Sequence, residues 1–159
     1  MTGFYNRLGF QQVAVRKFDI FKKEKGNLTI LFVDMDRLKH MNDHYGHECG
    51  DLALLAITGA IRAACEMDHT IAVRMGGDEF LLMLEETDDA DIRTLLEEIR
   101  REIPRMDEVG SLPYPPSVSI GYVVTDMSLD YDLDDYIREA DAIMYEIKRK
   151  KKGSAAVTG

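Results

Sequence analysis

Runs of apolar residues alternate along the chain with segments whose apolar positions recur at helical spacing. Residues 28–33 form a continuous apolar and β-branched run, which is typical of a strand buried on both faces. Three more runs, at 71–75, 80–85 and 118–124, also predict strands. Helical spacing predicts helices over 6–25, 37–43, 51–65, 90–105 and 133–150. Strands interleaved with helices indicate an α/β (α+β sandwich) domain with one central mixed sheet flanked by helices.

Two of the predicted strands are joined by a short segment that carries two glycines and two acids. The glycines, Gly76 and Gly77, predict a tight hairpin turn, in which glycine reaches positive φ without strain. Asp78 and Glu79 follow at once, and bare backbone beside two acids can hold a phosphate and a divalent cation together. Asp34 ends the first strand. If these strands are neighbours, Asp34 and Asp78 converge, and converging carboxylates repel unless a cation such as Mg²⁺ or Mn²⁺ joins them.

Other polar residues nearby have simpler explanations. Asp36 fits the cap of the helix that follows, or a supporting role, because acids favour the first helical turn. A calcium-binding loop starting at Asp34 is excluded, since Lys39 stands where the turn glycine is needed and Leu38 replaces an oxygen ligand. The pair His40 and His44 has helical spacing but no third ligand, so we expect it to face solvent.

Composition narrows the function classes. A chain of 159 residues predicts one domain, and its net charge of −9 argues against a nucleic-acid partner. Cys49 and Cys65 fit a reducing compartment without disulfides. No apolar run approaches the roughly 20 residues of a membrane span. We therefore expect a cytoplasmic domain without membrane contact, although a full-length parent could be membrane-anchored. The tail at 153–159 is expected to be a last edge strand or a frayed end.

Six motifs in order resemble the GGDEF family of bacterial diguanylate cyclases. They are Thr2-Gly-Phe-Tyr-Asn-Arg7, Asp34-x-Asp-x-Leu-Lys-x-x-Asn-Asp43, Gly46-His-x-x-Gly50-Asp51, Gly76-Gly-Asp-Glu-Phe80, Ser119-Ile-Gly121 and Ala140-Asp-Ala-x-Met-Tyr145-x-x-Lys148. The resemblance spans almost the whole chain and implies a ferredoxin-like βααββαβ core, related to the palm of nucleotidyl cyclases and polymerases. Because only Met1 precedes Thr2, where the family has Asp-x-Leu, we expect residues 1–159 to be a single domain excised from a longer signalling protein with an upstream sensory domain.

The resemblance implies an enzyme that condenses two GTP molecules into cyclic di-GMP and releases two pyrophosphates. The 3′-hydroxyl of each GTP attacks the α-phosphate of the other, with Mg²⁺ or Mn²⁺ as cofactor. Each chain holds one GTP, so a two-fold homodimer is expected. The alternative is a GTP-binding regulatory module without turnover, although such members usually have a damaged signature. Asp51 argues against a cyclase that uses a base other than guanine. A DNA-polymerase palm is also disfavoured, because the chain is too short and too acidic to hold a duplex.

By the same resemblance, the metal ligands are Asp34, the carbonyl of Met35, and Asp78. Glu79 binds a second ion or helps to deprotonate the 3′-hydroxyl, so Asp78 and Glu79 are the catalytic pair. Which acid acts as the base stays open, because adjacent strand residues point to opposite faces unless the turn twists them together.

The guanine readers implied by the family are Asn42 and Asp51. A carboxylate can accept from both N1–H and the 2-amino group of guanine, and an amide can meet the acceptor edge. Asp51 also fits a plain helix cap after Gly50, and it could do both.

The resemblance also implies that Lys148 and Lys152 bind the triphosphate, where Lys152 replaces an arginine of the family. Lys151 replaces the usual glycine, and a solvated basic helix end is the alternative for the whole run at 148–152. The remaining substrate contacts are Leu38, Lys39, Gly76 and Gly77.

Many family members bind their product at an Arg-x-x-Asp motif before the hairpin. Here the two slots hold Met67 and Thr70, so product inhibition is predicted to be absent at that site.

Overall fold

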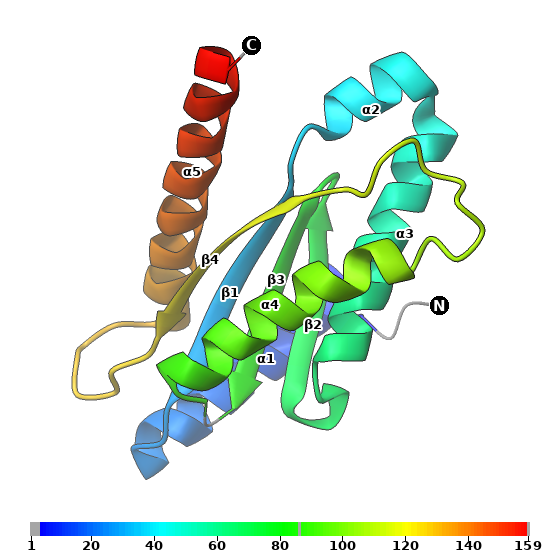
Figure 1. Cartoon of the computed structure of the whole chain (residues 1–159). Coiled ribbons are helices and arrows are strands. Elements are labelled where there is room, and N and C mark those ends of the chain that lie inside the picture. The colour runs from blue at the N-terminus through cyan, green and yellow to red at the C-terminus, as the bar shows by residue number, and fades with distance from the viewer. Residues whose placement is uncertain (1–3, 86, 159) are drawn as a thin grey trace.

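The computed structural model describes residues 4–85 and 87–158 and contains one sheet covered by helices on both faces (Figure 1). The elements in chain order are α1 (Arg7–Glu24), β1 (Leu28–Met35), α2 (Leu38–Tyr45), α3 (His47–Ala64), the 3₁₀ turn η1 (Met67–His69), β2 (Thr70–Gly76), β3 (Glu79–Glu85), α4 (Asp89–Arg105), β4 (Val118–Val124) and α5 (Leu133–Thr158). The described strands are ordered β2-β3-β1-β4.

This order is the βααββαβ arrangement of a ferredoxin-like core, as predicted. The expectation of a mixed sheet was wrong for these strands, because β1 pairs antiparallel with both β3 and β4, and β3 pairs antiparallel with β2. The physical reason is that each helical crossover returns the chain in its original direction but skips one place in the sheet. A strand of opposite direction fills each gap. The isolated bridge between Tyr5 and Val73, at the outer side of β2, is parallel.

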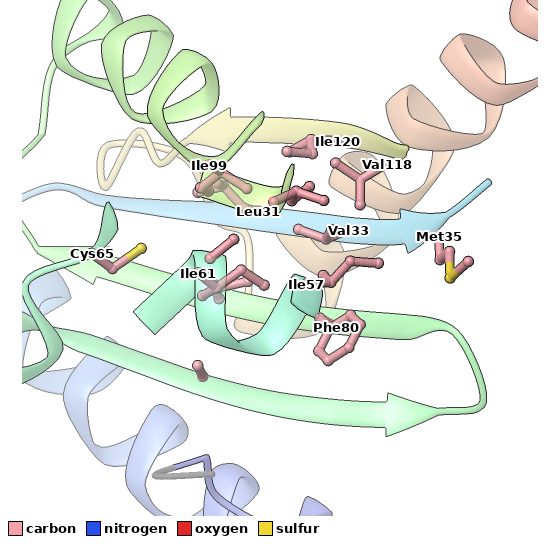
Figure 2. Close-up of a cluster of buried hydrophobic side chains, with 14 of the residues drawn as sticks. Leu31, Val33, Met35, Ile57, Ile61, Cys65, Phe80, Ile99, Val118 and Ile120 are labelled. Atoms are coloured by element: carbon pink, nitrogen blue, oxygen red, sulfur yellow. The ribbon is translucent and has the colours of Figure 1, made fainter. Parts of the chain in front are cut away.

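Strand β1 forms the centre of the fold, and all eight of its residues are buried. Because side chains alternate along a strand, Leu31, Val33 and Met35 face the layer of α3 and α4, where they pack with residues such as Ile57 and Ile99 (Figure 2). Ile30 and Phe32 face the opposite cluster, which contains residues of α1 and α5. In Figure 1, α3 and α4 lie in front of the sheet, α1 lies behind it, and α5 runs along the side of β4.

Two helix boundaries differ from the predictions. Gly46, at φ +90°, alone separates α2 from α3, so α3 begins at His47 and not near Asp51. Helix α5 continues to Thr158, which contradicts the predicted edge strand at the tail. The basic run at 148–152 does not stop the helix, because lysine and arginine are good helix formers.

Among the described residues, both cysteines are free thiols, and no helix combines the length and apolarity that crossing a bilayer requires.

Candidate functional site

The predicted acids meet where β1 ends and the β2–β3 hairpin turns. Asp34 lies directly opposite Glu79 in the β1–β3 register, so these two side chains share one face of the sheet. The backbone N–H of Met35 donates to the carbonyl of Asp78 at 2.9 Å, which ties the turn to the end of β1. The turn thus brings Asp78 beside Asp34, although the two lie 44 positions apart in the sequence.

Of the two features predicted for the hairpin glycines, a turn with positive φ and a bare backbone open to a ligand, the structure contradicts only the first. Neither Gly76 nor Gly77 has φ in the left-handed region, so the prediction of a turn that requires positive φ was wrong. A Cβ added at either position would meet nothing within 4 Å, so the backbone here is open to a ligand. The register shifts between Arg74 and Gly76, and this bulge re-aims the turn. The Arg74 guanidinium donates to the Gly77 carbonyl through Nε (3.1 Å) and Nη2 (2.6 Å), which holds the turn in place.

One ammonium group lies among the three groups expected to bind a metal. Lys148 Nζ, from α5, donates to Asp34 Oδ1 at 2.8 Å and to the Met35 carbonyl at 3.1 Å. The same Nζ lies 4.0 Å from Asp78 Oδ2. Asp34, Met35 and Asp78 therefore converge on a single positive charge, with oxygen atoms of the kind that Mg²⁺ and Mn²⁺ prefer. Among the described residues, no cluster of three or more histidine, cysteine or acidic side chains has metal-binding geometry.

Burial makes Asp34 an unusual carboxyl. Loss of solvent, and after it the neighbouring charge of Asp78, raises the pKa of Asp34 to about 6, although the hydrogen bond from Lys148 opposes this rise. A nearby cation would stabilise the ionised form of this carboxyl and would oppose the rise in its pKa.

Of the two roles predicted for Asp36, a helix cap or a supporting role, the cap was wrong. The residue before α2 is Arg37, in the left-handed conformation (φ 59°, ψ 34°), and no side chain caps this helix. The Asp36 carboxylate instead accepts from Ser117 Oγ (2.7 Å) and Ser119 Oγ (2.6 Å), beside and within β4. Lys151 Nζ approaches the same carboxylate at 2.9 Å. Burial alone would raise the pKa of Asp36, but these hydrogen bonds outweigh it and lower the pKa below its usual value.

The two predicted triphosphate lysines are placed differently. Lys148 is partly buried at the acid pair, whereas Lys152 and Lys39 are exposed. Lys151 was not predicted as a functional residue, yet it also donates to the Val118 carbonyl at 2.6 Å and so fastens α5 to β4. Its spacing of three from Lys148 is the sequence signal that could have placed it on the same helix face.

The predicted guanine readers lie on α2 and α3. Asp51 is in the second turn of α3, so its predicted alternative role as the cap of that helix was wrong. It lines a hollow of about 310 Å³ with apolar neighbours that include Phe4 and Leu54. The Asn42 side chain packs on Gly50, where any Cβ would overlap Asn42 Oδ1, and Leu38 lies on the same glycine. Gly50 therefore lets α2 approach α3 closely beside Asp51.

The histidine pair forms a local contact on α2. The rings of His40 and His44 stack with centroids 4.0 Å apart, and His44 Nδ1 lies 2.9 Å from the His40 carbonyl. His40 Nδ1 also lies 3.2 Å from the Tyr114 hydroxyl. The pair therefore has partners of its own, separate from the contacts of Asp34.

Comparisons with known proteins agree with this architecture. The family profile described as "Diguanylate cyclase, GGDEF domain" matches residues 1–154. The chain is 31% identical over 153 residues to diguanylate cyclase DgcP of Escherichia coli K12, covering 96% of this chain and 44% of that protein. It is 36% identical over 131 residues to the bifunctional diguanylate cyclase/cyclic di-GMP phosphodiesterase MucR of Pseudomonas aeruginosa, covering 79% of this chain and 18% of that protein.

A solved structure of a GGDEF domain has the same fold as this chain. The GGDEF domain of DgcB from Caulobacter crescentus, in complex with c-di-GMP, superposes with a TM-score of 0.80 at 25% identity and covers 92% of this chain and 86% of that one. The chain thus spans less than half the length of these curated relatives but most of a solved GGDEF domain. The fold, the six ordered motifs and the family match together establish that this chain belongs to the GGDEF domain family.

Proposed function

We propose that this domain is a diguanylate cyclase that condenses two GTP molecules into cyclic di-GMP. In each half of the reaction a 3′-hydroxyl oxygen forms a bond to an α-phosphorus, and the bond from that phosphorus to the bridging oxygen of pyrophosphate breaks. Two such steps consume two GTP and release two pyrophosphates. The observation that carries the proposal is the convergence of Asp34, the Met35 carbonyl and Asp78 on the Lys148 ammonium, beside an open hairpin backbone.

The donor set fits a divalent metal. Two carboxylates and a carbonyl are hard oxygen ligands, and the Lys148 ammonium already lies among them as a positive charge. Mg²⁺ or Mn²⁺ held by Asp34, Met35 and Asp78, with Glu79 nearby, would neutralise charge that develops on the phosphates.

The remaining residues would bind and orient the nucleotide. Asp51 accepts from N1–H and the 2-amino group of guanine, and Asn42 meets the acceptor edge of the base. The open backbone at Gly76 and Gly77 lets the triphosphate approach the turn, with Lys148 as its cationic partner. Asp78 or Glu79 takes the proton of the attacking hydroxyl.

The reaction requires two copies of the domain. The hollow beside Asp51 would take one guanine base, so each chain would hold one GTP, and each GTP must present its 3′-hydroxyl to the other. We therefore propose a two-fold homodimer as the catalytic unit, assembled in a longer protein by an upstream sensory domain.

The test is incubation of the concentrated domain with GTP and Mg²⁺, followed by chromatography of the products. We expect cyclic di-GMP and pyrophosphate in a ratio of one to two. Asp34→Asn and Asp78→Asn should abolish product formation and retain the fold, because each removes one of two charged ligands. Glu48→Gln, an exposed acid on α3, is the matched control and should retain activity.

Substantial turnover by either ligand variant would refute the metal assignment. GTP binding without any product, at concentrations where the domain is dimeric, would favour the alternative of a regulatory module without turnover.

A further inference from the structure

The Lys148 ammonium occupies the place that the proposed metal would need. It contacts Asp34 Oδ1 and the Met35 carbonyl and lies 4.0 Å from Asp78 Oδ2, so it uses the same oxygen atoms. The contact is well shielded from water, with 18% of the Lys148 side chain and 10% of the Asp34 side chain exposed. Two cations cannot share one set of ligands at these distances, so metal binding requires Lys148 to leave.

The ammonium also has a physical task in the nucleotide-free protein. Asp78 is close enough to Asp34 for its charge to contribute to the raised pKa of Asp34. Without a cation their repulsion would oppose the backbone contacts that hold the hairpin turn at the end of β1. Lys148 holds the two acids together, and its flexible four-carbon stem can release them without movement of α5.

We propose that Lys148 is a stand-in cation: it fills the metal site until nucleotide arrives and then moves to the triphosphate. This inference rests on the proposed function of the site. Metal alone must displace Lys148 into solvent, where the ammonium loses its anionic partners. Metal that arrives with nucleotide displaces it onto a polyanion. Metal and nucleotide should therefore bind with positive coupling, and by linkage each should raise the affinity of the other by the same factor.

Helix α5 supplies a matched control in Lys151. This lysine lies three residues further along and also holds a carboxylate of the β1 end, but its partners are Asp36 and the Val118 carbonyl. Its removal weakens the attachment of α5 and leaves the ligands Asp34 and Asp78 paired with Lys148.

The experiment measures Mn²⁺ binding to the dilute domain by electron paramagnetic resonance of the free ion, at mildly alkaline pH. Without nucleotide, Lys148→Met should bind Mn²⁺ roughly tenfold more tightly than the wild type, the effect expected from loss of one charge-assisted competitor. Lys151→Met should bind like the wild type. The nucleotide in the second measurement is 3′-deoxy-GTP, which lacks the attacking hydroxyl. Its addition should raise the Mn²⁺ affinity above that of the nucleotide-free domain by a larger factor in the wild type than in Lys148→Met.

The outcomes separate this inference from the proposed function. Equal Mn²⁺ affinity of the wild type and Lys148→Met without nucleotide overturns the stand-in cation and leaves the cyclase proposal intact. Undiminished Mn²⁺ binding by Asp34→Asn in the presence of 3′-deoxy-GTP overturns the metal site itself. Thermal unfolding verifies that each variant is folded, and Lys148→Gln, with the same expected gain, replaces Lys148→Met if that variant does not fold.

Discussion

Two aspartates at the end of β1 show how the surroundings of a residue set its chemistry. The pKa of Asp34 is raised to about 6 by burial, with a further contribution from the charge of Asp78. The pKa of Asp36 is lowered, because two serine hydroxyls and the Lys151 ammonium outweigh the effect of burial. Asp36 therefore has its hydrogen-bonding needs met within the fold, whereas Asp34 still gains from a cation.

Base choice should depend on a single carboxylate. The wild-type domain should bind GTP more tightly than ATP, and Asp51→Ser should narrow that difference. One lost charge-assisted contact corresponds to about 1.5–3 kcal/mol, or roughly ten- to a hundredfold in affinity. Calorimetric titration with each nucleotide measures both affinities. Glu48→Ser, on the same helix, should leave the ratio unchanged, and equal GTP affinity in the wild type and Asp51→Ser would show that Asp51 does not read the base.

The ion pair of Asp36 should make stability depend on pH. The lowered pKa means that the folded state favours the ionised carboxylate, so its contribution to stability is present above the ordinary pKa of 3.8 and is lost as the pH falls from there through the lowered pKa of the folded state. Asp36→Asn should lower the free energy of unfolding at neutral pH by about 1.5–3 kcal/mol. Urea unfolding measures this value, and the gap between variant and wild type should shrink below pH 3.8.

The control for Asp36→Asn is Glu146→Gln, which removes an exposed ion pair between Glu146 and Arg149 within α5. It should produce no measurable change, because exposed ion pairs contribute little. Equal stability of Asp36→Asn and wild type at neutral pH would contradict the assigned role of Asp36.

At the scale of elements, the site depends on how closely α5 lies against β4. A Cβ at Gly121 would overlap the Ala140 carbonyl oxygen and the Met144 nitrogen, both backbone atoms of α5. Only glycine allows this approach, which brings Lys148 and Lys151 to the end of β1. The position of the cationic side chains is therefore set by a residue that has no polar side chain of its own.

Gly121→Ala should consequently displace α5 and destabilise the domain. Overpacking against backbone costs about 1–3 kcal/mol or more, since backbone atoms cannot rotate away. Gly59→Ala is the control, because its added Cβ would meet the flexible end of Met106 and alanine is the better helix former. Thermal unfolding compares the stabilities of the two variants. A loss of stability in Gly121→Ala that is equal to or smaller than the loss in Gly59→Ala would refute the close-packing argument.

At the scale of the whole molecule, the end of the sheet opposite the acid pair differs from the family pattern. Met67 packs against the core, and Thr70 Oγ1 donates to the Glu66 carbonyl at 2.9 Å. The hollow beside this turn is lined by several acids, among them Glu85 and Glu98. These acids would repel an anionic dinucleotide, and positions 67 and 70 supply no arginine guanidinium to bind it with two hydrogen bonds.

Cyclic di-GMP should therefore not bind at residues 67–70. Calorimetric titration of cyclic di-GMP into the nucleotide-free domain measures this, and the double substitution Met67→Arg with Thr70→Asp should create binding where the wild type has none. Micromolar or tighter binding by the wild type that is lost on changing residues 67–70 would contradict the prediction.

The sequence by itself determined the elements and the types of residue that carry the chemistry. Residues 118–124 were predicted as a strand and form β4, because alternation and β-branching act between near neighbours. The intact signature and the acids Asp34 and Asp78 also identified the family, because these motifs are read directly along the chain. The start of α3 was missed, because a single glycine, Gly46, separates it from α2.

Only the tertiary structure decided the direction of the strands and the partners of the charged side chains. Lys148 reaches Asp34 across 114 positions, and Lys151 reaches Asp36 across 115. These contacts require β4 to pair with β1 and α5 to pack on β4, which are long-range events that no local pattern encodes. The same packing left Lys152 exposed and put Lys148 between the acids, because helix geometry allows only some side chains to face the sheet.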